Sequence, residues 1–163
     1  MIEKINIYEI LKKLDINYEM VEHKVAMTSE EAEFIKKLIK GEGVKNLFLK
    51  DGKNYYLILI PDDKKANIKN IKKLLKVNNL YFASSTDLEN VLGVTPGSVT
   101  PLGIVNDTDN KVLIIIDEFL IDKVLLMHPL TNTKTISIKY SDLVKYINHF
   151  NHKYRIENVV NDK

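Results

Sequence analysis

The sequence contains no cysteine and no tryptophan. Without cysteine the chain can form no disulfide, and it has no thiolate to serve as a nucleophile or a metal ligand. The HExxH, GxSxG, Walker and dinucleotide-binding patterns are missing as well, and the histidines and carboxylates do not fall at the spacing of a metal site. These absences predict chemistry that uses neither a metal nor another cofactor.

Long apolar runs and a strong charge of one sign are also missing. No apolar run reaches the ~20 residues of a membrane span, and the opening residues MIEKINIYEI do not have the pattern of a signal peptide. The formal net charge of +2 is far from the basic stripe of a protein that coats nucleic acid. We therefore expect a cytoplasmic protein with no membrane or DNA partner, in which any contact with nucleic acid has a small footprint.

The 163 residues, 45% of them hydrophobic and 28% charged, are enough for one globular domain with a substantial core. Helical and strand patterns are mixed without strict βαβ alternation. This predicts an α/β chain of the α+β type, with a mixed, largely antiparallel sheet or open barrel flanked by helices. We expect a single domain over residues 1–163, with its core over about 5–150 and a loose tail over about 151–163.

Polar residues mark the expected helix starts, because their side chains can accept hydrogen bonds from the first free amides of a helix. Thr28 stands three residues before Glu31, as in a capping box, and a hydroxyl beside a pocket is its alternative role. His149 and His152 fall near the end of the last helix, where we expect them to be solvated. The predicted helix starts are Asn6, Thr28, the cluster Ser84-Ser85-Thr86-Asp87 and Ser141. The predicted strands cover residues 18–22, 44–49, 55–60, 80–83, 111–117, 123–127 and 135–138.

The stretch GEGVKNLFLKD, residues 41–51, places a lysine in a predicted strand that ends at the hairpin signal Asp51-Gly52. Because side chains alternate along a strand, Lys45 shares a face with Leu47 and Leu49. A cation beside apolar surface needs an anionic partner or a path to water. Lys45 therefore either extends to water at the mouth of the strand or binds an anion such as phosphate.

Residues 93–107, GVTPGSVTPLGIVND, contain three of the six glycines and two of the four prolines. Such a stretch cannot form a regular helix, and it predicts a shaped loop. The free amides of such a loop could hold an anion or a polarised carbonyl group. The alternative is a rigid connector between a helix and a strand.

Six lysines cluster in and before the helix predicted over residues 68–77. The simplest interpretation is a solvated helix face, and a surface that contacts phosphate is the alternative. These lysines are Lys64, Lys65, Lys69, Lys72, Lys73 and Lys76.

Four stretches together resemble the YbaK/ProRS-associated superfamily of aminoacyl-tRNA editing domains, in the family's order and spacing. They are GEGVKNLFLKD, YYLILIP, FASSTDLENVLGVTPGSVTPLGIVND and MHPLTNTKTI, within a match over about residues 5–150. The resemblance is strongest to the PrdX branch (ProXp-ala), free-standing relatives of the editing domain inserted in bacterial prolyl-tRNA synthetase. The resemblance implies the fold of these editing domains. It also implies that the protein hydrolyses the ester of alanine mischarged on proline tRNA, in trans and without a metal. Alanine is small enough to enter a synthetase pocket built for proline, so a second sieve is needed.

The resemblance also implies roles for single residues. The family's motif lysine falls on Lys45, at the terminal adenosine and its phosphate. The family's GxxxP loop falls on Gly97–Pro101, with Gly97 and Ser98 at the aminoacyl ester. The motif histidine falls on His128, which would line the pocket for the amino-acid side chain.

Thr28, Asn46 and Pro101 complete the implied site as substrate-binding neighbours. In the implied reaction water attacks the ester carbonyl, amides of the Gly97 loop stabilise the oxyanion, and Lys45 orients the adenosine. No side chain is an obvious general base, so the ribose hydroxyl or the α-amine of the substrate are the alternatives for positioning water. The implied partners are the acceptor end of tRNA(Pro) and, as a further candidate, prolyl-tRNA synthetase.

The resemblance leaves the selectivity open, because relatives with the same fold remove cysteine, serine or threonine from tRNA through small changes in the pocket. Two other classes of function also compete with the enzyme. A binding module could hold aminoacyl-tRNA ends or a synthetase without cleaving anything, and a regulator could sense a free amino acid in the same pocket. The motifs at Lys45, Gly97 and His128 favour the enzyme, because a protein that only binds would not need all three.

Overall fold

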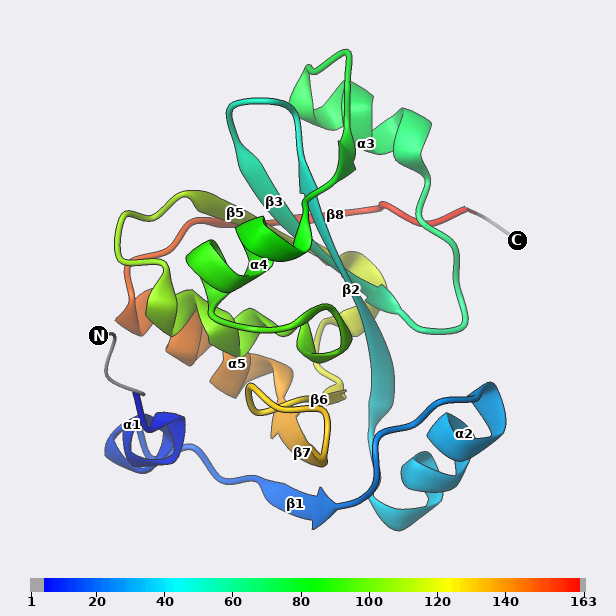
Figure 1. Cartoon of the computed structure of the whole chain (residues 1–163), viewed down its shortest axis with the longest axis vertical. Coiled ribbons are helices and arrows are strands. Elements are labelled where there is room, and N and C mark those ends of the chain that lie inside the picture. The colour runs from blue at the N-terminus through cyan, green and yellow to red at the C-terminus, as the bar shows by residue number, and fades with distance from the viewer. Residues whose placement is uncertain (1–4, 162–163) are drawn as a thin grey trace.

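The computed structural model describes residues 5–161, which form one mixed α/β domain (Figure 1). The α-helices are α1 (Ile7–Lys13), α2 (Ser29–Leu38), α3 (Ile68–Leu75), α4 (Ser85–Leu92) and α5 (Tyr140–His149), with short 3-10 helices η1 (Pro96–Ser98), η2 (Pro101–Asn106) and η3 (Glu118–Leu120). The strands are β1 (Glu19–Glu22), β2 (Glu42–Lys50), β3 (Tyr55–Pro61), β4 (Tyr81–Phe82), β5 (Val112–Asp117), β6 (Val124–Met127), β7 (Lys134–Lys139) and β8 (Tyr154–Glu157). No helix within residues 5–161 is both long and apolar enough to cross a bilayer.

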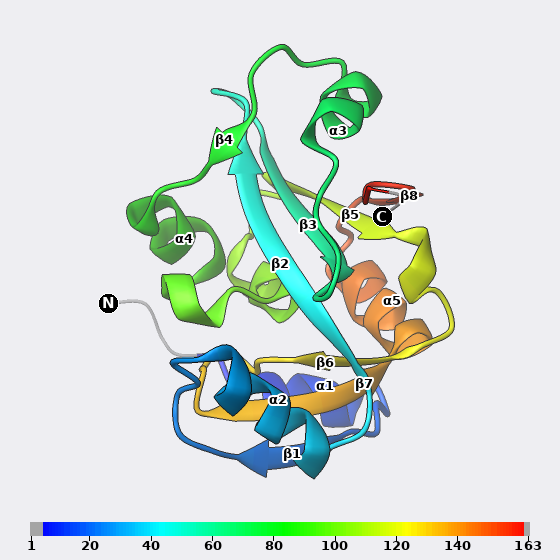
Figure 2. The same ribbon diagram turned by 90° about the vertical axis from the view of Figure 1, so that its right-hand side faces the viewer.

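The strands form one sheet in the order β1-β7-β6-β2-β3-β5-β8, with β4 paired to β2 outside this path. The pairs β1/β7, β6/β7, β2/β3 and β2/β4 are antiparallel, whereas β2/β6, β3/β5 and β5/β8 are parallel. The predicted mixed sheet with flanking helices is therefore confirmed. Figure 2 shows β2 as the long strand that joins the layer of β1, β7 and β6 to the layer of β3 and β5.

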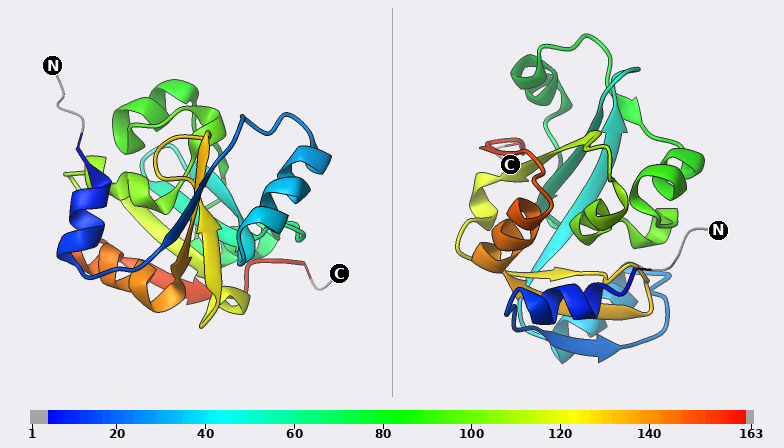
Figure 3. Two further views of the ribbon diagram at one scale, coloured as in Figure 1. Left: turned by 90° about the horizontal axis from the view of Figure 1, so that it is seen from below. Right: turned by 90° about the vertical axis from the view of Figure 1, so that its left-hand side faces the viewer.

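Side-chain alternation along β3 divides the core into two parts. Leu57 and Leu59 pack into the larger cluster, with α1, α4, η2 and α5, while Ile58 and Ile60 pack into the smaller one, with Ile71 of α3. Both faces of β3 are thus buried, which explains its nearly continuous apolar sequence. In both views of Figure 3, α1 and α5 lie side by side, and Lys145 Nζ of α5 donates to the Leu14 carbonyl at 3.1 Å.

Three of the four predicted helix caps are confirmed. Asn6 accepts a hydrogen bond from the Tyr8 amide, Thr28 from the Glu31 amide, and Ser84 from the Asp87 amide in a complete capping box. The prediction for Ser141 is wrong. Helix α5 begins two residues earlier than predicted, at Tyr140, and Lys139 occupies the cap position without a side-chain hydrogen bond.

The prediction of a loose tail over residues 151–163 is also wrong for residues 151–161, which the structure describes. Strand β8 pairs in parallel with β5, and Val159 is fully buried. The prediction that His152 is solvated is also wrong, because its side chain is buried and its Nε2 lies 2.9 Å from Asp107 Oδ2. The C-terminal segment therefore belongs to the folded core as far as residue 160, and residues 162–163 lie outside the described part.

Candidate active site

A small cavity of about 210 Å³ lies where α2 meets β2 and the β6–β7 hairpin. It contains two of the residues predicted for the site, Asn46 and His128. Pockets for drug-sized ligands usually occupy roughly 300–1,000 Å³, so this cavity suits a smaller group. Its walls are formed by Ala26, Ala32, Ile35 and Lys36, by Gly43, Val44 and Asn46 of β2, by Asp62, and by Leu126, Met127, His128 and Thr135.

Asn46 brings a free hydrogen-bond acceptor to the cavity wall. Its side-chain oxygen Oδ1 is buried and has no hydrogen-bond partner within residues 5–161. Leaving a buried acceptor unpaired typically costs about 1–3 kcal/mol. Buried polar atoms of this kind are rare in folded proteins, and a bound ligand or water is the usual partner. Asn46 is therefore a candidate group for binding a ligand with N–H or O–H donors.

His128, which directly follows β6, also lines the cavity. Its Nδ1 lies 2.9 Å from the carbonyl oxygen of Lys134, so Nδ1 must carry the proton and donate it, which leaves Nε2 as the acceptor nitrogen. Burial lowers the pKa of His128 below its usual 6.5, the Lys134 carbonyl opposes this only in part, and His23 adds to the lowering. The ring is thus neutral at pH 7, with its orientation set by the backbone.

His23, which follows β1, and Thr135 of β7 lie near His128, although the sequence did not single out Thr135. The His23 and His128 ring centroids are 6.3 Å apart. His23 Nδ1 lies 2.8 Å from the Lys24 carbonyl, and its Nε2 lies 2.8 Å from the Thr135 hydroxyl. This buried hydroxyl pairs β7 with the segment after β1 and fixes one side of the cavity.

An ion pair closes another side of the cavity, and no sequence pattern predicted it. Lys36 Nζ of α2 lies 2.6 Å from Asp62 Oδ2, which follows β3. Gly43 of β2 lies directly beneath the pair, since a Cβ atom added there would overlap the carboxylate oxygen of Asp62. Only glycine leaves room for this contact, so Gly43 is a structural requirement of the site.

Lys45 does not line the cavity. It is exposed, and its side chain lies on the face of β2 opposite Asn46, as alternation requires. Its Nζ donates to the carbonyl of Lys64 at 3.1 Å. Of the two possibilities for Lys45, the path to water is confirmed. The predicted role of Lys45 in binding an anion stays a prediction, and such an anion would lie beside the cavity and not inside it.

The Gly97 loop lies against the hairpin that carries His128, also outside the cavity wall. A Cβ atom at Gly97 would come within 2.9 Å of Asn132 Nδ2, in the β6–β7 connection. Gly97 is exposed, and its amide has no hydrogen-bond partner within residues 5–161. Ser98 is buried, and its amide is already bonded to the Thr95 carbonyl at 2.9 Å. Of these two amides, only that of Gly97 is free to bind an oxyanion.

The two remaining predicted residues, Pro101 and Thr28, each lie at the start of a helix. Pro101 is buried at the first position of η2, where its fixed φ and missing N–H suit the start of a helix. Thr28 is exposed and caps α2, 3.1 Å from the Glu31 amide, and it does not line the cavity. The predicted roles of Thr28 and Pro101 in substrate binding stay predictions.

Comparison with known families decides what kind of domain this is. The profile of the aminoacyl-tRNA editing domain family matches residues 23–146, which is most of the chain. The chain belongs to this family. The predicted family is thus confirmed, and the matched region contains the cavity, Lys45 and the Gly97 loop.

Two relatives match this editing domain over most of their own length. The prolyl-tRNA editing protein ProX of Acetoanaerobium sticklandii is 35% identical over 140 residues, covering 84% of this chain and 85% of that protein. Prolyl-tRNA synthetase associated domain-containing protein 1 of Mus musculus is 34% identical over 149 residues, covering 87% and 88%. A solved structure described as a candidate trans-editing enzyme for prolyl-tRNA synthetase has the same fold, with a TM-score of 0.75 at 18% identity over 95% of this chain and 94% of that one.

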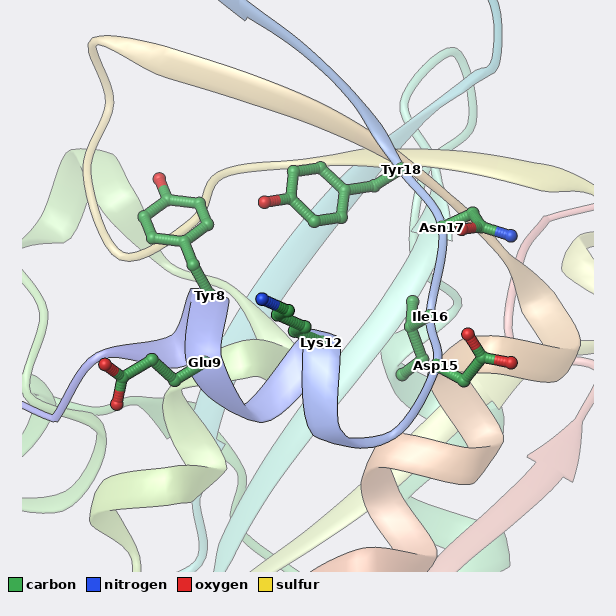
Figure 4. A pocket seen from close by; sticks show the side chains of 7 residues that line it. All are labelled: Tyr8, Glu9, Lys12, Asp15, Ile16, Asn17 and Tyr18. Atoms are coloured by element: carbon green, nitrogen blue, oxygen red, sulfur yellow. The ribbon is translucent and has the colours of Figure 1, made fainter.

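Two of the larger hollows of the editing domain are notable, and neither contains any of the predicted site residues. Figure 4 shows an open one of about 470 Å³ beside α1, where Tyr8 and Tyr18 face each other around Lys12. The other, of about 660 Å³, is an apolar groove between α2 and residues 22–27 that includes His23 and Phe34. Within residues 5–161 no three histidine or acidic side chains are grouped as metal ligands. Chemistry without a metal stays a prediction.

Proposed function

We propose that this editing domain is a trans-acting deacylase that hydrolyses the ester of alanine mischarged on tRNA(Pro). The observation that carries the proposal is the cavity of about 210 Å³, in which a buried, unpaired Asn46 Oδ1 stands with a neutral His128. A site of this size suits an aminoacyl group and not a whole nucleotide. The two relatives named for prolyl-tRNA editing and for the prolyl-tRNA synthetase associated domain support proline tRNA as the carrier.

Asn46 would bind the α-amino group of the esterified alanine. An ammonium group has only donors, so it matches a buried amide oxygen that lacks a partner. The methyl side chain would then lie among the apolar residues of the cavity, which include Ala32, Ile35 and Val44. Binding of alanine would remove the energetic cost of the unpaired oxygen.

Hydrolysis requires water to attack the ester carbonyl, with negative charge developing on the carbonyl oxygen. The free amide of Gly97 would stabilise that charge, and removal of one such donor commonly costs about 10²–10³ in rate. Lys45 would hold the phosphate of the terminal adenosine outside the cavity, which orients the ester at its mouth. Because no side chain is placed as a general base, the ribose hydroxyl or the α-amine of the substrate would position the water.

The direct test is release of labelled alanine from Ala-tRNA(Pro) by the purified protein. We expect rapid release, with Ser-, Cys- and Pro-tRNA(Pro) hydrolysed more slowly. Protein treated with a chelator and assayed in fresh magnesium, which the tRNA needs for folding, should keep full activity. Restoration of a lost activity only by zinc or manganese would contradict the metal-free reaction, and binding of Ala-tRNA(Pro) without release would show a binding module.

His128→Ala should weaken alanine removal and relax the exclusion of proline. A small rigid pocket rejects a larger side chain by about 1–3 kcal/mol, or roughly tenfold to a hundredfold. The measurement is the ratio of Ala-tRNA(Pro) to Pro-tRNA(Pro) deacylation in the wild type and the variant, with His149→Ala as a control because His149 is exposed. An unchanged ratio would move size exclusion to the α2 wall of the cavity.

A further inference from the structure

The positive charge of this chain is concentrated in one segment. Residues 64–76 carry six lysines and no acidic residue, whereas the remaining chain has 18 of the 24 basic residues against all 22 acidic ones. The segment is therefore +6 and the remainder −4, although the net charge of +2 suggests a nearly neutral protein. We call the six lysines of this segment the lysine ridge: Lys64, Lys65, Lys69, Lys72, Lys73 and Lys76.

The ridge is the outer face of α3 and of the segment that precedes it. Ile71 is fully buried and Leu74 and Leu75 pack on the smaller core cluster, which turns the lysine side of the helix to solvent. Lys69, Lys73 and Lys76 follow each other at intervals of four and three residues, so they lie on one face. Within residues 5–161, none of the six lysines has a carboxylate within 4.0 Å. Their charges are not neutralised by the fold.

The ridge begins beside the candidate active site. Asp62 lines the cavity, and two residues later the carbonyl of Lys64 accepts the hydrogen bond from Lys45. Figure 2 shows the chain leading from the end of β3, next to β2, to α3 at the far end of the molecule. An anionic polymer with its end at the cavity would therefore meet Lys45 first and the ridge afterwards.

We propose that the lysine ridge binds the phosphate backbone of the RNA whose 3′ end occupies the cavity, a proposal that rests on the function proposed above. Helix α3 has 8 residues and is about 12 Å long, so it can contact about three phosphates. A protein interface would need an apolar centre, and Ile68, which is 36% exposed, is the single large exposed hydrophobic residue of the ridge segment. The chemistry therefore favours a nucleic acid backbone over an acidic protein.

The test compares two triple variants that remove the same charge from different surfaces. Both sets are exposed lysines, so neither variant should unfold the protein, which circular dichroism would check. The ridge variant is Lys69→Gln, Lys73→Gln and Lys76→Gln, and the control is Lys13→Gln, Lys111→Gln and Lys153→Gln.

The first readout is the affinity for uncharged tRNA(Pro) over a range of KCl concentrations. The logarithm of the binding constant falls linearly with the logarithm of the KCl concentration, and removal of one lysine that binds a phosphate should reduce the size of this slope by about 1. The slope of the ridge variant should therefore be smaller by about 3. The ridge variant should also bind about tenfold to a hundredfold more weakly at low salt, because its phosphate contacts are missing. The control should change much less. Equal behaviour of the two variants would overturn the proposal. Polyglutamate serves as a probe for an acidic protein partner, so a ridge variant that loses polyglutamate binding but keeps tRNA binding would also overturn it.

The second readout separates the ridge from the catalytic proposal. Alanyl-adenosine carries the same ester without a phosphate backbone, so the ridge variant should hydrolyse it within about twofold of the wild-type rate while losing activity on Ala-tRNA(Pro). Full activity of the ridge variant on both substrates would contradict the proposal that the ridge binds RNA, but it would not affect the proposal that the protein is a deacylase. No hydrolysis by the wild type, with tRNA binding that still depends on the ridge, would overturn the deacylase alone.

Discussion

Lys45→Ala is expected to lower kcat/KM for alanine release from Ala-tRNA(Pro) by about a hundredfold while leaving the fold intact. A hydrogen bond to a charged group contributes about 1.5–3 kcal/mol, and each 1.4 kcal/mol corresponds to a factor of about ten. The Lys45 side chain is exposed and donates to the Lys64 carbonyl, so its removal costs little stability. Single-turnover deacylation and circular dichroism on the same preparation give both quantities.

The control is Lys53→Ala, an exposed lysine in the hairpin that follows the same strand, which should keep wild-type activity. Lys45→Arg retains the charge and should recover part of the loss. Because Lys45 is placed outside the cavity, its removal should affect alanyl-adenosine less than Ala-tRNA(Pro). Near-normal activity of a folded Lys45→Ala protein on the tRNA substrate would remove Lys45 from the mechanism.

His152→Ala is expected to destabilise the protein by about 3 kcal/mol. Removing the partner of a buried carboxylate typically costs about 3–5 kcal/mol, because it leaves the negative charge uncompensated. The side chains of His152 and Asp107 are 1% and 2% exposed, and Asp107 keeps hydrogen bonds from the Lys111 and Val112 amides, which favours the lower end. Urea unfolding should show a lower midpoint with an unchanged slope.

His149→Ala is the matched control, since His149 lies three residues earlier and is exposed, and it should change stability by less than about 0.5 kcal/mol. Burial raises the pKa of Asp107, but the hydrogen bonds from His152 and the two amides outweigh it and hold the pKa below the usual 3.8. The contribution of Asp107 is therefore fully present above pH 3.8 and is lost as the pH falls through its lower folded-state pKa. Equal stability of the two variants would show that the C-terminal segment is not held by this pair.

The local elements could be predicted because their signals lie within a few residues. The Thr28 cap depends on an amide three residues away, and the Asp51-Gly52 turn joins neighbouring strands. Alternation along β2 correctly placed Lys45 with Leu47 and Leu49, on the face opposite Asn46. Strand β8 was missed because its partner β5 lies about forty residues earlier and its own sequence, YRIE, has little apolar pattern.

The site was predicted in part, through the family motifs. They named Asn46 and His128, which the structure brings into one cavity. They contained no information on the pairing of Lys36 with Asp62, or on the hydroxyl of Thr135 that holds His23. These contacts join residues far apart in the sequence, and a lysine, an aspartate or a threonine has no local signal of its partner.

The sequence by itself determined the family, through its motifs. It also determined three of the four predicted helix starts and the face of β2 on which each side chain lies, because backbone geometry and neighbouring residues set these two features. The tertiary structure alone decided which of those faces borders a cavity. The parallel pairing of Glu42 and Gly43 with Leu125 and Leu126 brings Asn46 beside His128 and leaves Lys45 on the other side, at the start of the lysine ridge. Such pairing reflects the packing of the whole chain, which no single stretch of sequence contains.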